Sequence, residues 1–194
     1  MSVPSQQEDE IHSSIVATRD AAKLWHPAPD GRLSHWAEPG IIDLKVSPMQ
    51  LDRAFRIVQY VIDLSRLHGM EVRELQRARG QRPGIGIGLR RHLAAINVSE
   101  LRHLVPFGEL DLEHCDQESR LWWTHEEEFR ERGYVARADG RLRLRLPRRY
   151  DRPPRGQAGW RFSFTDQVGC PLENQVEEIV LALRSRAARD SPSR

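Results

Sequence analysis

The feature that most constrains the fold is a strand that leads directly into a long amphipathic helix, in residues 41–69. Ile42, Leu44 and Val46 alternate with the charged residues Asp43 and Lys45, which is the period of a strand with one buried face. Apolar residues then recur at helical spacing and predict one buried helix face. These residues are Leu51, Ala54, Phe55, Val58, Val61 and Ile62.

Local signals predict both ends of this helix. Ser47 is a favoured N-cap residue, Pro48 occupies the first helical position, and Gln50 completes a capping box. We expect the helix to end near His68, with Gly69 as the glycine that terminates it. Residues 41–69 therefore predict a half-buried strand followed by a helix with a single apolar face.

The last third of the chain carries a second clear pattern. Leucines alternate with arginines over 141–146, and aromatic residues alternate with polar ones over 160–164. We expect two antiparallel neighbouring strands, joined by a Pro-, Gly- and Arg-rich loop over 147–159. Pro171 is expected to open a final helix. The apolar face of that helix consists of Leu172, Val176, Ile179, Val180 and Leu183.

The middle of the chain gives weaker signals. Strands are expected over 70–75, over Ile85, Ile87 and Leu89 with the glycines between them, and over 93–98. A helix over 99–104, an acidic loop over 109–118 and a short helix from Thr124 to Gly133 complete this region.

These elements predict an α+β fold, in which a mainly antiparallel sheet carries the two long amphipathic helices on one face. Residues 1–10 are predicted to be a flexible tail, and 11–40 an N-terminal helix with an irregular packed arm anchored by Trp25 and Trp36. Residues 41–189 form the single α+β domain, and 190–194 a second tail.

The composition and apolar patterning of the chain argue against a disordered, a membrane-spanning and a disulfide-rich protein. With 194 residues, 39% hydrophobic and 30% charged, the chain can bury a core without disulfides or metal. It lacks an apolar run of transmembrane length and a signal-peptide pattern, so no membrane partner is expected. Its two cysteines, Cys115 and Cys170, cannot build a disulfide framework, which favours a reducing cytoplasm.

Arginine dominates the basic residues, because the only lysines are Lys23 and Lys45. A GC-rich genome would explain this bias, and so would recognition of phosphate or carboxylate by the guanidinium fork. The arginines concentrate on the predicted C-terminal hairpin, where they could hold a nucleic-acid backbone and Tyr150 could stack on a base. The predicted nucleic-acid-binding residues are Arg141, Arg143, Arg145, Arg148, Arg149, Tyr150, Arg152, Arg155 and Arg161.

Two alternatives to nucleic-acid binding stay open for this hairpin. Its arginines could form a solvated sheet face, or pair with acids of the same chain such as Asp43 or those of the 109–118 loop. They could also meet an acidic protein partner, which would make the chain an adaptor or the subunit of a complex.

No pattern predicts a catalytic residue, a metal ligand or a cofactor. The glycines of 84–88 precede no Gly-Lys-Ser/Thr and are better interpreted as a glycine-rich strand or hairpin. The run Glu113–Asp116, with His103 and His125, lacks the spacing of a zinc site. Trp122-Trp123 fits a core residue beside a half-exposed one, and Asp166 fits a turn or cap residue. An enzyme whose site is assembled from scattered residues is a third, weaker hypothesis.

Several separate stretches carry a family resemblance, namely 12–19, Val46-Ser47, 53–57, 140–144, Asp166 and Leu172-Glu173. In these stretches the chain resembles a family of uncharacterised bacterial proteins found in mobile-element and plasmid contexts. Many members carry a helix-turn-helix segment ahead of a shared C-terminal domain, and the segment before His12 is too short to hold one. The resemblance implies the partner-binding or regulatory half of such a protein.

Together these observations predict a non-enzymatic regulatory or accessory protein that contacts nucleic acid, DNA in preference to RNA, through the arginine-rich hairpin. The alternative is a protein–protein adaptor that binds an acidic partner.

Overall fold

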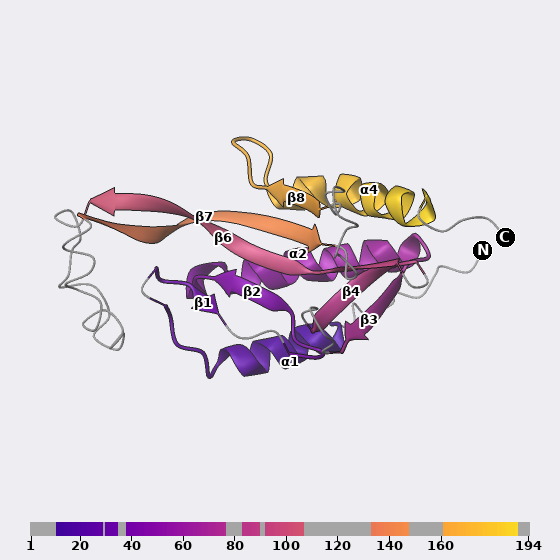
Figure 1. The fold of residues 1–194 in the computed structure, drawn as a ribbon, viewed down its shortest axis with the longest axis horizontal. Coiled ribbons are helices and arrows are strands. Elements are labelled where there is room, and N and C mark those ends of the chain that lie inside the picture. The colour runs from indigo at the N-terminus through magenta and orange to yellow at the C-terminus, as the bar shows by residue number, and fades with distance from the viewer. Residues whose placement is uncertain are drawn as a thin grey trace, which may run out of the picture.

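The computed structural model describes residues 11–28, 30–34, 38–76, 83–89, 92–106, 133–147 and 161–189. These residues form an α+β fold with two sheets and three α-helices, α1 (Ser13–Ala22), α2 (Pro48–Leu67) and α4 (Val176–Arg189) (Figure 1). None of these helices combines the length and apolar character needed to cross a membrane. The predicted tails, Trp36, the 109–118 loop, the helix from Thr124 and all but the first residue of the 147–159 loop lie outside the described residues.

The larger sheet has the strand order β1-β2-β6-β7-β8. Its strands are β1 (Leu33–Ser34), β2 (Asp43–Val46), β6 (Asn97–Pro106), β7 (Tyr134–Pro147) and β8 (Arg161–Thr165). Only β2 and β6 pair in parallel, and the other neighbours are antiparallel. The mostly antiparallel pairing is confirmed, and so is the predicted pairing of the two C-terminal strands, β7 and β8.

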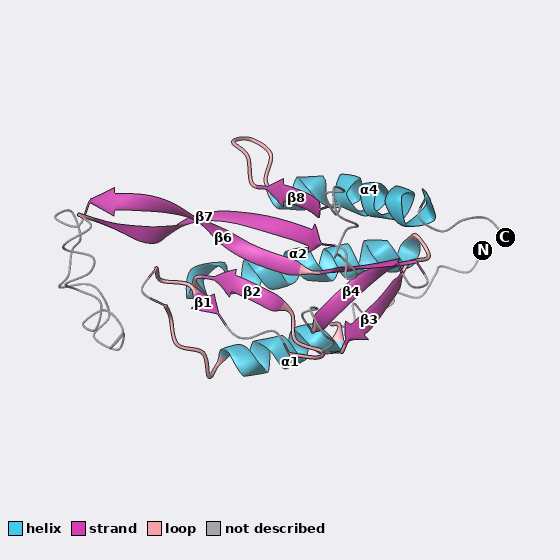
Figure 2. Ribbon diagram, viewed as in Figure 1, coloured by secondary structure: helices cyan, strands magenta, loops and turns pink. Residues whose placement is uncertain are grey.

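The single predicted sheet is wrong, because three of the strands form a second sheet with the order β3-β4-β5. They are β3 (Glu71–Leu75), β4 (Gly84–Leu89) and β5 (His92–Ala95), and all their pairings are antiparallel (Figure 2). Ile96 alone separates β5 from β6, and its N–H donates to the carbonyl of Ile85 at 2.8 Å. One long stretch of chain thus pairs first with β4 and then with β2 and β7.

Helix α2 begins and ends at the predicted residues, but its N-terminal contact is a different one. Pro48 is the first helical residue and Ser47 the N-cap, yet the Ser47 side chain makes no capping bond. The carboxylate of Glu100, on β6, accepts the Ser47 backbone N–H at 2.7 Å. Glu100 therefore takes the place that a capping box would give to Gln50. At the other end Gly69 has φ 71° and its N–H donates to the carbonyl of Arg66, as in a Schellman motif.

The core lies between the helices and the larger sheet, and continues onto β4 and β5. Helix α2 contributes its predicted apolar face, packs against α4, and contacts β2 and β7. Leu142, Leu144 and Leu146 of β7 are all fully buried in this core, so the arginines that alternate with them face away from it. The alternation predicted for 141–146 is confirmed.

The helix predicted over 99–104 is wrong. These residues are part of strand β6, because antiparallel pairing with β7 overrides their local helical pattern. Pro171 opens the final helix as predicted: it is the N-cap of a 3-10 turn, η2 (Leu172–Gln175), that leads directly into α4.

Candidate nucleic-acid interface

The arginines of β7 lie on a polar face formed by four neighbouring strands. Strand register aligns Lys45, Ser99, Arg143 and Thr165 in one row across β2, β6, β7 and β8. The adjacent row holds Asp43, Asn97, Arg145 and Ser163. We call these eight residues the polar face. It carries three cations and one carboxylate, and its other side chains are hydroxyls and an amide.

The two central arginines differ in how they are held. Arg143 is half-buried, and its Nε donates to the Thr165 hydroxyl at 3.3 Å. Arg145 is exposed, and no described residue forms a hydrogen bond or ion pair with its side chain. Residues two apart on a strand are about 6.8 Å apart along it. The face thus offers one oriented guanidinium beside one that is open to a ligand.

Arg141 is already paired. Its guanidinium donates to the carboxylate of Asp139 at 2.6 and 3.1 Å, and its backbone N–H donates to the same carboxylate at 2.9 Å. Burial would raise the pKa of Asp139, but the hydrogen bonds and charge of Arg141 hold that pKa below its ordinary value. Self-pairing, the alternative left open by the sequence, therefore applies to Arg141, although its partner is neither Asp43 nor the 109–118 loop.

The remaining predicted residues are not placed by the structure. Arg148, Arg149, Tyr150, Arg152 and Arg155 lie outside the described residues. Arg161 pairs with Pro147 through its backbone, but its side chain is not described. Of the nine predicted residues, the structure brings together Arg141, Arg143 and Arg145 on β7.

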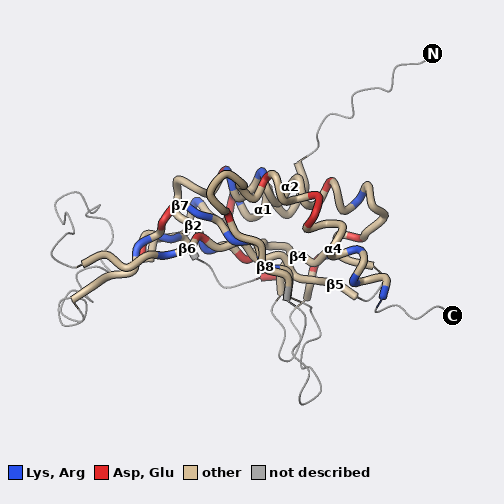
Figure 3. The backbone as a smooth tube through the Cα atoms, turned by 90° about the horizontal axis from the view of Figure 1, so that it is seen from above, with Lys and Arg blue, Asp and Glu red and all other residues tan. Residues whose placement is uncertain are grey.

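Lys45 is the cation that the sequence reasoning missed. The alternation of β2 already predicted that its side chain points away from the core. Its place in the Arg143 row depends on the parallel pairing of β2 with β6, which brings together segments about fifty residues apart. Figure 3 shows basic positions along β2, β6 and β7, on strands that also carry acidic residues.

The irregular part of the β6–β7 pairing lies next to this face. Register shifts between Glu100 and Arg102, where Gly140 on β7 adopts φ 81°. This irregularity turns the Gly140 N–H toward Glu100, whose carboxylate accepts it at 2.8 Å. Beyond it the two strands continue as a ribbon that neither β2 nor β8 flanks (Figure 1). The polar face therefore occupies the part of β7 where the sheet is widest.

A second charged cluster joins α2 to the end of β8. Arg53 donates to both oxygens of Asp166 at 2.8 Å, and to both oxygens of Glu173 at 2.7 Å. Asp166 also accepts the backbone N–H groups of Leu142 at 2.6 Å and Leu172 at 2.8 Å. Four of the five N–H donors of Arg53 are directed at these carboxylates, which leaves little capacity for a ligand. We call Arg53, Asp166 and Glu173 the clamp.

The electrostatics of the clamp fit a structural role. Burial raises the pKa of Asp166, but the bonds from Arg53 and the two backbone N–H groups lower it by more, so the net shift is downward. The hydrogen bonds from Arg53 likewise lower the pKa of Glu173, and the two acids together raise the pKa of Arg53. All three groups are held in their charged forms. Asp166 is thus more than a turn residue, because it connects β7, α2 and η2.

The clamp includes several of the residues that carry the resemblance described above. Arg53, Asp166 and Glu173 are among those residues, and Leu142 supplies one of the N–H groups. Another of them, Thr18 on α1, accepts the backbone N–H of Ile42 at 3.0 Å. In this structure these residues stabilise the fold.

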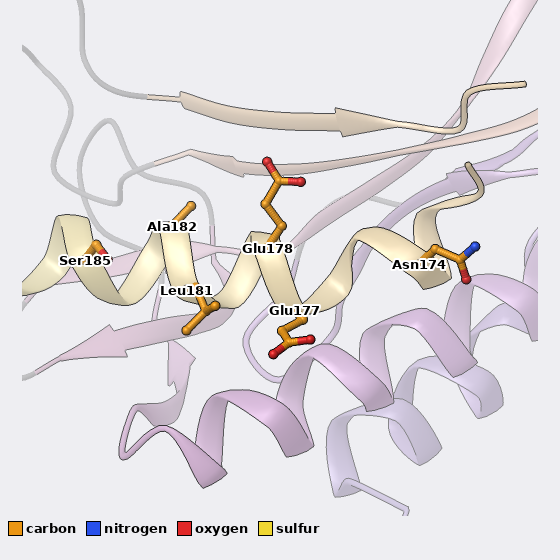
Figure 4. A pocket seen from close by; sticks show the side chains of 6 residues that line it. All are labelled: Asn174, Glu177, Glu178, Leu181, Ala182 and Ser185. Carbon is orange, nitrogen blue, oxygen red and sulfur yellow. The ribbon is translucent and has the colours of Figure 1, made fainter. Parts of the chain in front are cut away.

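Other candidate sites receive little support. The described residues contain no group of three potential metal ligands, and His103 lies exposed on β6. The run Glu113–Asp116, His125 and Trp122-Trp123 lie outside the described residues. An open groove runs along α4, where Glu177 and Glu178 extend to opposite sides of the helix (Figure 4). The groove is lined by Asn174, Glu177, Glu178, Leu181, Ala182 and Ser185.

Comparison with protein-family models, with curated proteins and with solved structures found no match to this chain. The resemblance to the bacterial mobile-element family therefore stays a prediction, and the candidate interface rests on its own geometry.

Proposed function

We propose that this chain is a regulatory or accessory protein of the cytoplasm that binds nucleic acid through the polar face of its larger sheet. The observation that carries the proposal is Arg145, an exposed guanidinium with no partner among the described residues, beside the hydroxyl-held Arg143. The resemblance to proteins of mobile-element and plasmid contexts, which is a prediction from the sequence, agrees with DNA as the ligand. We therefore expect DNA to bind in preference to RNA.

The arrangement of the helices relative to the larger sheet supports this role. We infer that α2 and α4 cover the same face of the larger sheet and leave the polar face for a ligand. Leu142 and Leu144 of β7 share one core with Val58 of α2 and Ile179 of α4. Because successive strand residues point to opposite faces, Arg143 and Arg145 face the side away from both helices.

The charge of the polar face suits a polyanion. Lys45, Arg143 and Arg145 outnumber the single carboxylate, Asp43. Guanidinium groups bind phosphate through two parallel N–H bonds, and each neutralised phosphate releases counterions. The surrounding hydroxyls of Ser163 and Thr165 can donate to phosphate oxygens. Binding driven in this way must weaken as the salt concentration rises.

Fluorescence anisotropy with labelled DNA duplexes tests the proposal. If the three cations contact three phosphates, log K should fall against log salt with a slope of about −2.7. The variant Arg143→Glu with Arg145→Glu should abolish binding. A matched control is Arg56→Glu with Arg184→Glu, which changes the net charge equally at two exposed helix positions. No binding at about 50 mM salt, or equal loss in both double variants, would overturn the proposal.

A second candidate is an adaptor that binds an acidic protein. The arginines of β7 suit an acidic partner, and the ribbon beyond the sheet offers a protein contact, since Leu104 is 64% exposed and Tyr134 is 47% exposed. Leu104 and Pro106 pair with Ala136 and Tyr134, so these residues share one face of the ribbon. An exposed apolar stripe is typical of a protein contact. Co-purification of a partner that Leu104→Lys releases, together with indifference to added DNA, would favour this candidate over the first.

A further inference from the structure

The polar face of the larger sheet has a width and a composition that limit what it can recognise in a nucleic acid. We infer that this face binds the phosphates of a duplex and does not contact base edges, so that it contributes affinity without sequence preference. The inference rests on the proposed function and specifies the ligand as a nucleic-acid duplex of any sequence.

The polar face is wider than the major groove of a DNA duplex. Neighbouring strands lie about 4.8 Å apart, so the four strands β2, β6, β7 and β8 span about 14 Å between their outer axes. The major groove of B-form DNA is about 12 Å wide and admits an α-helix or a two-stranded ribbon. The four-stranded face is therefore too wide to enter the groove. Because Arg143 and Arg145 lie on β7, an inner strand of the four, we expect them to meet the phosphates that rim the groove and not its floor.

The composition of the polar face does not suit the binding of unpaired bases. Proteins that bind single strands on a sheet stack bases on exposed aromatic side chains. On β8 the aromatic residues Phe162 and Phe164 align with Leu146 and Leu144, so they share the core face. The positions of β8 that share the polar face are Ser163 and Thr165. The eight residues of the polar face include no aromatic side chain, so it offers no stacking surface to unpaired bases.

The close spacing of the cations on the polar face favours a duplex over a single strand. A duplex presents one charge per about 1.7 Å of its axis, twice that of one strand. The cations of the polar face occupy two adjacent strand rows, with Lys45 and Arg143 in one and Arg145 in the other. A compact cluster of this kind gains most from a ligand with closely spaced phosphates on a rigid backbone.

The test uses the full chain, anisotropy, and a panel of four labelled duplexes of equal length and unrelated sequence, with one single strand from each. We expect the four duplexes to bind with Kd values within about threefold, since a single unfavourable base pair in a sequence-read site costs about fivefold or more. Each single strand should bind more weakly than its duplex.

Single substitutions then assign the effect to the polar face. Arg145→Gln and Lys45→Gln should each weaken all four duplexes by a common factor and reduce the salt slope by about 0.9. Arg184→Gln, at an exposed position of α4, is the control and should leave the slope unchanged. Circular dichroism of each variant confirms that it is folded.

Three results would contradict the inference. Duplex affinities that differ more than about tenfold, with the difference lost in Arg145→Gln, would mean that the face reads bases. Tighter binding of single strands than of duplexes would mean that bases are stacked. Either result leaves the proposed function intact, whereas an absence of binding to every oligonucleotide overturns the proposed function and the inference together.

Discussion

Arg53 and Asp166 lie 113 residues apart in sequence, yet their side chains form two parallel hydrogen bonds of 2.8 Å. Their side chains are 22% and 9% exposed, so the pair is largely shielded from water. Because Asp166 also accepts the backbone N–H groups of Leu142 and Leu172, one carboxylate connects a helix, a strand and the turn before α4. This contact joins the turn that leads into the final helix to the sheet and to α2.

Replacement of Asp166 should therefore be costly. Asp166→Asn leaves the charge of Arg53 without its more buried partner and turns an amide donor toward N–H groups. We expect the free energy of unfolding to fall by about 2 to 4 kcal/mol. Urea denaturation measures it. The control Glu173→Gln should cost less than about 1 kcal/mol, because Glu173 is 39% exposed. Equal costs for the two variants would contradict the central role of Asp166.

Lowering the pH should weaken the contact of Arg53 with Asp166 and Glu173. The pKa of Asp166 and that of Glu173 are both lower in the folded chain than their ordinary values of 3.8 and 4.5. The unfolded chain therefore takes up protons first, and stability falls as the pH drops below about 4.5 toward the folded pKa values. Urea unfolding at stepwise lower pH measures this slope. Asp166→Asn should flatten it, and an unchanged slope in that variant would show that other groups dominate acid unfolding.

Glu100 should matter more to α2 than Gln50 does. Glu100 is 3% exposed and accepts the backbone N–H groups of Ser47 and Gly140. Glu100→Gln places an amide donor against one of these N–H groups and should lower the melting temperature, at a cost of about 1 to 3 kcal/mol. Gln50→Ala should be nearly neutral by comparison. The opposite ranking would show that the local capping box operates after all.

The glycines of β4 should be structural. A Cβ at Gly88 would lie 2.0 Å from the carbonyl oxygen of His92, which is backbone. At Gly86 it would lie 2.7 Å from the end of the Leu75 side chain, which can shift. We expect Gly88→Ala to destabilise by about 2 kcal/mol or more, and Gly86→Ala by less. Thermal unfolding of both variants decides this, and a harmless Gly88→Ala would contradict the close approach of β4 and β5.

The parts of the fold that the sequence predicted are those with local signals. Helix α2 has Pro48 at its first position, Gly69 after its end and a regular apolar face, so its limits are visible without knowledge of its neighbours. The helix predicted over 99–104 was wrong, because the strand that pairs with these residues, β7, lies about 30 to 45 residues further along the chain and supplies the pairing that decides their structure.

In the candidate interface, too, only the features with a local signal could be predicted. Alternation alone placed Arg143 and Arg145 on the outer face of a strand. It could not show that Arg141 is paired with Asp139 or that Lys45 joins the Arg143 row, since the first depends on side-chain geometry and the second on a parallel strand pairing. The clamp could not be predicted either, because its arginine lies 113 and 120 residues from its two acids in the sequence.

The central claim is that the polar face binds nucleic acid through phosphate contacts. The most direct measurement is a titration of a labelled DNA duplex with the unmodified protein at several salt concentrations, from about 50 to about 300 mM. The account predicts a Kd in the micromolar range or tighter at the lowest salt, and a slope of log K against log salt of about −2.7. A Kd that does not change with salt, or no binding at the lowest salt, would contradict it.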